Sequence, residues 1–207
     1  MDPHYTCSAV RRRLTGIAAA LCAACTVLLC ACSQEDDSAA GKFLKAKEKA
    51  EKGNAPSQTS VGVAYKNGEG VAQDDVEAAK WFRRAAEQNY AIAQDFLGSC
   101  YDGGKGVEKD YVEAVKWYRK AAEQDYATAQ GNLGHCYNFG TGVNSDYSEA
   151  YAWYSLAADS GQLMAGFSAQ VRKKLAEKMS PQQITAGEQR TKELRAQIDA
   201  KLKNGGK

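Results

Sequence analysis

The sequence predicts an all-α protein, an α-solenoid of about three helix–turn–helix units that stack on one another. A segment of 36 residues occurs three times without a gap, at positions 55–90, 91–126 and 127–162. In each copy, two stretches with helical apolar periodicity flank a glycine-rich loop. Each copy also places a tryptophan at the same position: Trp81, Trp117 and Trp153. One helical pair cannot bury such a broad apolar face, but stacked pairs can, so the repeats predict a continuous core that contains the tryptophans.

Residues 1–31 are expected to be a secretory signal peptide. Three arginines, Arg11–Arg13, precede an uncharged run from Leu14 to Ala31 that is rich in alanine, leucine and valine. A basic stretch followed by a short apolar run and small residues is typical of such peptides. The alternative is an uncleaved transmembrane helix, because the run is just long enough to span a bilayer. Both interpretations tether the chain to a membrane and place the rest of it away from the cytosol.

The end of this apolar run, Leu29-Cys30-Ala31-Cys32, resembles the lipobox of bacterial lipoproteins. The resemblance implies cleavage before Cys32 and a lipid on that cysteine. Cys30 is a weaker candidate, because Leu29 stands where a small residue is expected. Ser33, directly after the lipid site, implies the outer membrane of a two-membrane bacterium, with the protein facing the periplasm. Positions 32–41 would then comprise the lipidated cysteine and a flexible acidic linker.

The repeat unit begins with a truncated copy. Lys49 to Gln58 matches the end of one repeat and the start of the next, so positions 42–54 are expected to form a partial repeat helix. The second and third units read A-x-x-x-L-G-x-x-Y, G-x-G-V and D-x-x-E-A-x-x-W-Y-x-x-A-A, and the first follows the same frame with few departures; this pattern resembles the Sel1-like repeat, a relative of the tetratricopeptide repeat. This resemblance implies a right-handed solenoid that presents a concave surface to other proteins and has no chemistry of its own.

The glycine-rich loop from Gly103 to Asp110 could be a phosphate-binding loop or a turn between helices. Asp110 is expected to cap the next helix and Glu113 to complete a capping box, which would occupy the amides that a phosphate needs. Lys105 is not repeated, since Glu69 and Thr141 take its place in the other copies. The same acidic pairs occur in those copies as Asp74 with Glu77 and Asp146 with Glu149. The loop is therefore predicted to be a turn, with no bound cofactor.

Positions 163–207 are expected to form C-terminal capping helices. Leu163, Ala165 and Ala169 align weakly with a fourth first helix. The segment Ser180 to Gln183 predicts a helix start with proline in its first turn, and that helix should run to about Lys203. One apolar stripe of this helix comprises Ile184, Thr191, Leu194 and Ile198. A partner-binding helix is the alternative interpretation of this segment.

The candidate binding surface comprises first-helix positions that vary between copies while the repeat frame stays fixed. These positions are expected to be polar, weakly charged and punctuated by exposed Phe96 and Phe139, which suits a peptide or an extended segment. Any one of them could instead be ordinary solvated helix surface. The candidates are Ser60, Val63 and Asn67 in the first copy; Asp95, Phe96, Ser99 and Asp102 in the second; and Asn132, His135, Asn138 and Phe139 in the third.

The composition of the chain and the spacing of its histidine and cysteine residues narrow the range of possible functions. Basic and acidic residues balance after the first 32 positions, which argues against a nucleic-acid partner. His135 lacks a second histidine with ligand spacing, so neither a metal site nor a catalytic residue is predicted. Cys100 and Cys136 occupy equivalent repeat positions and are expected to be buried, reduced thiols. The main hypothesis is a membrane-anchored protein- or peptide-binding adaptor. The alternatives are a cell-wall enzyme or penicillin-binding protein of the cysteine-rich Sel1-like type, and a structural spacer.

Overall fold

The computed structural model describes residues 38–161 and 165–205. The predicted signal peptide and the lipid site at Cys32 lie outside this part of the chain. Every regular element within the described ranges is a helix, and none of these helices is both long and apolar enough to cross a membrane. The helices are α3 (Ala39–Glu51), α4 (Ala55–Asn67), α5 (Asp75–Glu87), α6 (Ala91–Gly103), α7 (Tyr111–Ala122), α8 (Ala127–Phe139), α9 (Tyr147–Asp159), α10 (Ala165–Ala176) and α11 (Pro181–Gly205).

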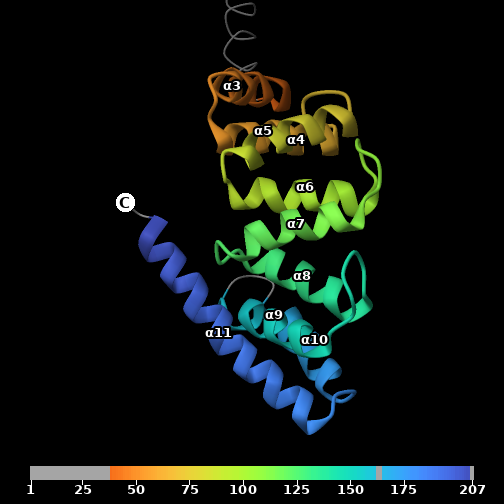
Figure 1. Cartoon of the computed structure of the whole chain (residues 1–207). Helices are drawn as coiled ribbons and strands as arrows, with labels where there is room; N and C mark the ends of the chain where they lie inside the picture. The colour runs from red at the N-terminus through yellow and green to blue at the C-terminus, as the bar shows by residue number, and fades with distance from the viewer. Residues whose placement is uncertain (1–37, 162–164, 206–207) are drawn as a thin grey trace, which may run out of the picture.

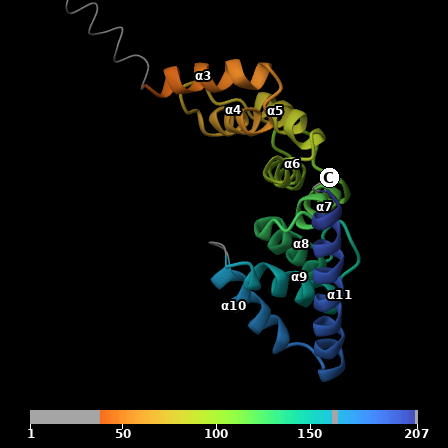
Figure 2. The ribbon, with the colours of Figure 1, turned by 90° about the vertical axis from the view of Figure 1, so that its left-hand side faces the viewer.

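The helices stack as antiparallel pairs in chain order (Figure 1). Helices α4, α6 and α8 are the first helices of the three repeats, and α5, α7 and α9 are the second helices. The stack is bowed, with α4, α6, α8 and α10 along its hollow side (Figure 2). The candidate binding residues were expected to lie on this concave face. The predicted solenoid is confirmed.

A glycine in each first helix permits close packing within the pair. A Cβ atom on Gly98 would lie 2.7 Å from the ring of Tyr118, which is closer than real side chains approach. Gly62 meets the ring of Phe82, and Gly134 meets the ring of Tyr154, in the same way. The glycine thus lets the aromatic ring of the second helix lie directly against the backbone of the first.

The three tryptophans lie in the core, as the repeat register predicts. Their exposed fractions are 5% for Trp81, 8% for Trp117 and 0% for Trp153. Trp117 packs with Phe82 and Leu97, so it joins the first repeat to the second. Burial of a large aromatic side chain is worth several kcal/mol at about 25 cal/mol per Å², and repeating it along the stack links the units into one core.

The glycine loops are turns, and their glycines are needed for steric reasons. Gly106 has a φ of 70°, and a Cβ atom there would collide with the carbonyl of Asp75 in the preceding second helix. Gly70 approaches Ala39 of α3 in the same manner. Helix α3 therefore occupies the place of the second helix of a preceding repeat, as the truncated copy predicts. It begins at Ala39, three residues before the expected start.

The aspartate caps form, but the reciprocal half of the predicted capping box does not. Asp110 accepts a hydrogen bond from the backbone N–H of Glu113 at 3.0 Å. The backbone N–H of Asp110 donates to the carbonyl of Tyr101, not to Glu113. The Glu113 carboxylate instead pairs with Lys116 at 2.7 Å. The loop folds back on the preceding helix and satisfies the cap's N–H with a backbone carbonyl, which leaves the glutamate free for a surface ion pair.

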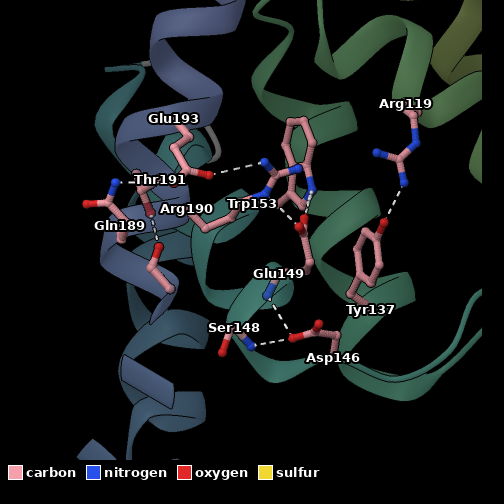
Figure 3. Close-up of polar contacts among 11 residues, drawn as sticks. Arg119, Tyr137, Asp146, Ser148, Glu149, Trp153, Gln189, Arg190, Thr191 and Glu193 are labelled. Atoms are coloured by element: carbon pink, nitrogen blue, oxygen red, sulfur yellow. Dashed lines mark hydrogen bonds and ion pairs between the residues drawn. The ribbon is translucent and has the colours of Figure 1, made fainter. Parts of the chain in front are cut away.

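The final helix covers the last core face. Leu194 and Ile198 of α11 are buried against the same cluster as Trp153. Arg190 of α11 donates to Glu149 of α9 at 2.6 Å, and the other oxygen of Glu149 accepts from the indole of Trp153 at 3.2 Å (Figure 3). Helix α11 packs on α9 and runs back along the stack, so it is not the second helix of a fourth repeat (Figures 1 and 2).

Two contacts at the far end of α11 fix this path. Arg195 pairs with Asp125 at 2.9 Å, and Lys201 pairs with Glu123 at 2.7 Å, both in the turn between α7 and α8. The predicted start of α11 is confirmed, because the Ser180 hydroxyl accepts from the backbone N–H of Gln183 and the Gln183 side chain accepts from that of Ser180.

Candidate ligand groove on the concave face

A groove with a volume of about 420 Å³ lies between α8 and α10, with Tyr154 of α9 at its base. That volume is within the usual range of about 300–1,000 Å³ for ligand sites. Helix α10 stands in the position of a fourth first helix, so the groove continues the series of spaces between successive first helices. The lining residues are Ala127, Thr128, Gly131, Asn132, His135, Asn138, Phe139, Tyr154, Phe167, Ser168, Val171, Lys174, Leu175 and Lys178.

Small residues keep this groove open. Between α6 and α8, the Asn132 amide donates to the carboxylate of Asp95 at 2.8 Å, so a polar bridge joins the two helices. One repeat further along the chain, Gly131 and Ser168 take the positions of Asp95 and Asn132. A Cβ atom on Gly131 would meet only the Ser168 hydroxyl, at 3.6 Å. The bridge is therefore missing between α8 and α10, and a cavity remains there.

Two phenylalanines stand exposed beside the groove. The exposed fraction is 66% for Phe139 on α8 and 60% for Phe167 on α10. His135 lies against Phe139 with 4.6 Å between the ring centroids. Grouped exposed aromatic side chains are characteristic of interaction sites on soluble proteins. The groove therefore offers apolar surface from both of its walls.

The structure brings together the four candidates of the third copy. Asn132, His135, Asn138 and Phe139 all line the groove. From the second copy, Phe96, Ser99 and Asp102 line a smaller cavity of about 140 Å³. The first-copy candidates do not share a cavity with them: Ser60 and Asn67 are exposed, and Val63 is half buried against the core.

Two candidates of the second copy lie deeper than expected. Phe96 is half buried, contrary to the expected exposure, because its ring stacks on Phe82 with centroids 4.8 Å apart. Asp95 is buried, because it faces the neighbouring first helix across the bridge to Asn132. These positions face the next repeat in the stack. Helical periodicity alone does not distinguish a face that packs on a neighbouring repeat from one that is exposed to solvent.

The α10 side of the groove was missed from the sequence. Phe167, Val171, Lys174 and Lys178 follow one another at helical spacing along one side of α10 and its end. Phe167, Val171 and Lys174 correspond to the candidate positions of Asp95, Ser99 and Asp102, whereas Lys178 corresponds to the loop glycine Gly106, and the repeat pattern is weak here. Gln170 replaces the glycine of the repeat frame, and Arg172 replaces its small core residue. The 36-residue register, continued past 162, was the sequence signal that could have found Phe167, Val171 and Lys174.

The bridge at Asp95 makes stability depend on pH. Burial raises the pKa of Asp95 to about 6, against the opposing effects of the Asn132 hydrogen bond and of Lys66. The folded state therefore keeps this proton to a higher pH than the unfolded state does. The resulting stabilisation is fully present below about pH 4 and is lost as the pH rises through about 6, a change of about 2–3 kcal/mol.

Replacing Asp95 by asparagine is accordingly expected to stabilise the protein above pH 6, because the amide carries no charge to bury. The free energy of unfolding at pH 7.5 should rise by about 1–3 kcal/mol, and its decline between about pH 4 and 6 should disappear. Urea denaturation across this pH range measures both effects. Asp102→Asn, which removes a charge from the same helix, should leave the decline in place. A decline that persists in Asp95→Asn would contradict this account of the bridge.

Cys100 and Cys136, the two cysteines in the part of the chain that the structure describes, are unpaired and buried. Burial raises the pKa of the Cys100 thiol to about 11 and that of the Cys136 thiol to about 12. A thiol is nucleophilic as the thiolate, so these groups are poorly suited to catalysis near neutral pH. Within residues 38–161 and 165–205, no three His, Cys, Asp or Glu side chains are grouped so as to hold a metal ion.

Comparison with known proteins identifies the repeat. The profile of the Sel1 repeat matches residues 55–90, 91–126 and 127–162, the same boundaries that the sequence register predicts. The chain belongs to the Sel1 repeat family. Sel1 repeats generally mediate interactions between proteins, and proteins of this family are generally non-catalytic adaptors. No protein with a curated functional description matches this chain.

Solved structures share the Sel1 fold. A protective antigen of uropathogenic Escherichia coli with an SLR fold is 30% identical, with a TM-score of 0.69 over 79% of this chain and 35% of that one. A Sel1 repeat protein from Oxalobacter formigenes is 36% identical, with a TM-score of 0.54 over 61% of this chain and 57% of that one. Cysteine-rich protein B of Helicobacter pylori is 21% identical, with a TM-score of 0.52 over 64% of this chain and 98% of that one, and it supports the fold alone. This chain thus spans about a third of the length of the Escherichia coli antigen and somewhat over half of the length of the Oxalobacter formigenes protein.

Proposed function

We propose that this Sel1 repeat protein is an envelope lipoprotein that binds another protein or a peptide on its concave face, with no catalytic step of its own. The groove between α8 and α10 carries the proposal, because Phe139 and Phe167 expose most of their surface beside a 420 Å³ cavity. Curved repeat stacks use such faces to hold extended partners. The smaller cavity next to Phe96 extends the same face toward the first repeat.

The membrane anchor is proposed from the sequence. Cys32 would carry the lipid and would hold the repeats at the periplasmic side of the outer membrane of a bacterium. Acyl chains contribute about 0.8 kcal/mol per buried methylene, so the anchor needs no protein contact. Metabolic labelling with a fatty acid tests this separately from ligand binding: Cys32→Ala should abolish incorporation of the label, and Cys30→Ala should leave it unchanged.

The chemistry of the groove favours binding over catalysis. His135 is exposed against the ring of Phe139, and the adjacent Cys136 is buried in the core with a raised pKa. Two side chains that are neighbours in the sequence thus lie in separate environments. The groove has apolar walls and a few hydrogen-bonding groups. Such a lining is better suited to binding a side chain of a partner than to catalysing a reaction.

Photocrosslinking from the groove tests the adaptor function. Benzoylphenylalanine is placed at Phe139 or at Phe167 in the full chain, and at Val112 as a matched control, since Val112 is an exposed apolar residue of α7 outside the groove. In intact cells, both groove positions should give the same adduct of defined mass, and Val112 should not. Equal adduct yields at all three positions, or an adduct at Val112 alone, would overturn the proposal.

A further inference from the structure

The charge of the groove is one-sided. Its lining contains two lysines, Lys174 and Lys178, and no carboxylate. Neither ammonium group has an ion-pair or hydrogen-bond partner among the residues that the structure describes. In contrast, Arg172 of the same helix lies 4.0 Å from Asp159. The two groove lysines are therefore available to a partner that brings negative charge.

The smaller cavity beside Phe96 differs in charge and in space. Its lining holds Lys66 and Lys105 together with Asp75 and Asp102, so charges of both signs are already present there. Its volume is about 140 Å³, against about 420 Å³ for the groove between α8 and α10. A partner with a bulky apolar side chain and acidic neighbours therefore fits the α8–α10 groove and not the cavity beside Phe96.

The order of residues along α10 determines where the apolar and acidic groups of such a partner would lie. Phe167, Val171 and Lys174 succeed one another at intervals of three or four residues on one side of α10, and Lys178 lines the groove from the turn directly after the helix. Gly131 faces this line from α8 and leaves room beside Ser168. A side chain held in the groove, which Phe139 and Phe167 both line, would place its acidic neighbours near the lysines.

We infer that the groove between α8 and α10 binds an acidic peptide segment, with one large apolar side chain inserted into the groove that Phe139 and Phe167 both line and flanking carboxylates on Lys174 and Lys178. This inference rests on the proposed adaptor function and adds the chemistry of the partner. Attraction between exposed charges is modest and is screened by salt, so the apolar insertion supplies most of the affinity and the lysines select for acidic sequence.

Fluorescence anisotropy with defined peptides tests this inference on the full chain in detergent micelles. The probe is a fluorescein-labelled nonapeptide with a central tryptophan flanked by glutamates. Its matched versions carry glutamine in place of glutamate, or alanine in place of tryptophan. The glutamate–tryptophan peptide should bind about fivefold to tenfold more tightly than the glutamine version at low salt, and the alanine version should not bind measurably.

Protein variants separate the apolar and charged contributions. Gly131→Leu fills the groove and should abolish binding, and Phe139→Ala with Phe167→Ala, which removes only exposed rings, should weaken it at least tenfold. Lys174→Gln with Lys178→Gln should remove the preference for glutamate. Lys173→Gln with Lys192→Gln removes the same charge from exposed positions outside the groove and should change the dissociation constant less than about twofold.

The outcomes distinguish the two proposals. If the glutamine peptide binds as tightly as the glutamate peptide and Gly131→Leu abolishes both, the adaptor groove stands and the acidic preference is wrong. If glutamate-dependent binding survives in Gly131→Leu and in the double phenylalanine variant, the charge acts without the groove and the inference is overturned. If no tryptophan peptide binds, the inference is likewise overturned, and the crosslinking pattern alone decides the adaptor function.

Discussion

Replacement of Trp117 by alanine is expected to lower the free energy of unfolding by about 3–5 kcal/mol. Trp117 packs in the cluster that joins the first and second repeats, where Phe82 and Leu97 are its fully buried neighbours. Removing the indole leaves a cavity that rigid helices on both sides cannot close. Because each repeat is stable only through its neighbours, the loss affects the whole stack. Thermal and urea denaturation followed by circular dichroism measure the change.

Trp117→Phe is the matched control for this prediction. The indole nitrogen of Trp117 is buried without a hydrogen-bond partner, whereas that of Trp153 donates to Glu149. Phenylalanine keeps much of the apolar volume and removes an unsatisfied donor, so the cost should be about 1–2 kcal/mol. An unchanged melting temperature in Trp117→Ala would mean that this side chain does not support the junction between repeats.

Gly106→Ala is expected to destabilise the protein by more than about 3 kcal/mol. The added Cβ atom would collide with the backbone carbonyl of Asp75, and backbone cannot move aside as a flexible side chain can. The positive φ of 70° adds a conformational cost of about 1–2 kcal/mol for a residue with a side chain. The loop would have to shift away from the preceding repeat, which opens the junction between the two units.

Gly68→Ala isolates the conformational part of this cost. Gly68 has a φ of 74°, close to that of Gly106, but its nearest neighbour for a Cβ atom is the side chain of Gln73 at an ordinary 3.6 Å. Its replacement should cost only about 1–2 kcal/mol by urea denaturation. Equal losses in the two variants would show that the contact between Gly106 and Asp75 contributes nothing to stacking.

The fold was predictable because equivalent residues recur at a constant spacing of 36 positions. Trp81, Trp117 and Trp153 mark the core at every unit, and the aspartate caps mark the start of each second helix. The reciprocal capping bond was predicted wrongly. The backbone N–H of Asp110 donates to the carbonyl of Tyr101 and not to Glu113, because the loop folds back on the preceding helix. The spacing of residues in the sequence does not specify this path of the loop.

Buried polar residues were harder to predict. Gln58, Gln94 and Gln130 recur at one repeat position and are all buried, with each side chain donating to a carbonyl of the preceding second helix. An apolar pattern carries no signal for such residues. Asp95 was assigned to the surface for the same reason, since its partner Asn132 lies a full repeat away in the sequence.

The candidate groove was predicted from one wall only. Asn132, His135, Asn138 and Phe139 varied against a fixed frame and were identified on that basis. The opposite wall belongs to α10, where the repeat pattern fades because the next helix, α11, returns along α9 and completes no fourth unit. The path of α11 depends on long-range pairs such as Arg195 with Asp125, which local sequence cannot reveal.

The most direct test of the central claim is the yield of the crosslinked adduct from position 139 in the presence and absence of the groove. With benzoylphenylalanine in place of Phe139, the full chain should form one adduct of defined mass in intact cells. Adding Gly131→Leu, which fills the cavity from the same helix, should eliminate that adduct. An adduct of unchanged mass and yield in the filled variant would contradict the claim that this groove is where the protein holds its partner.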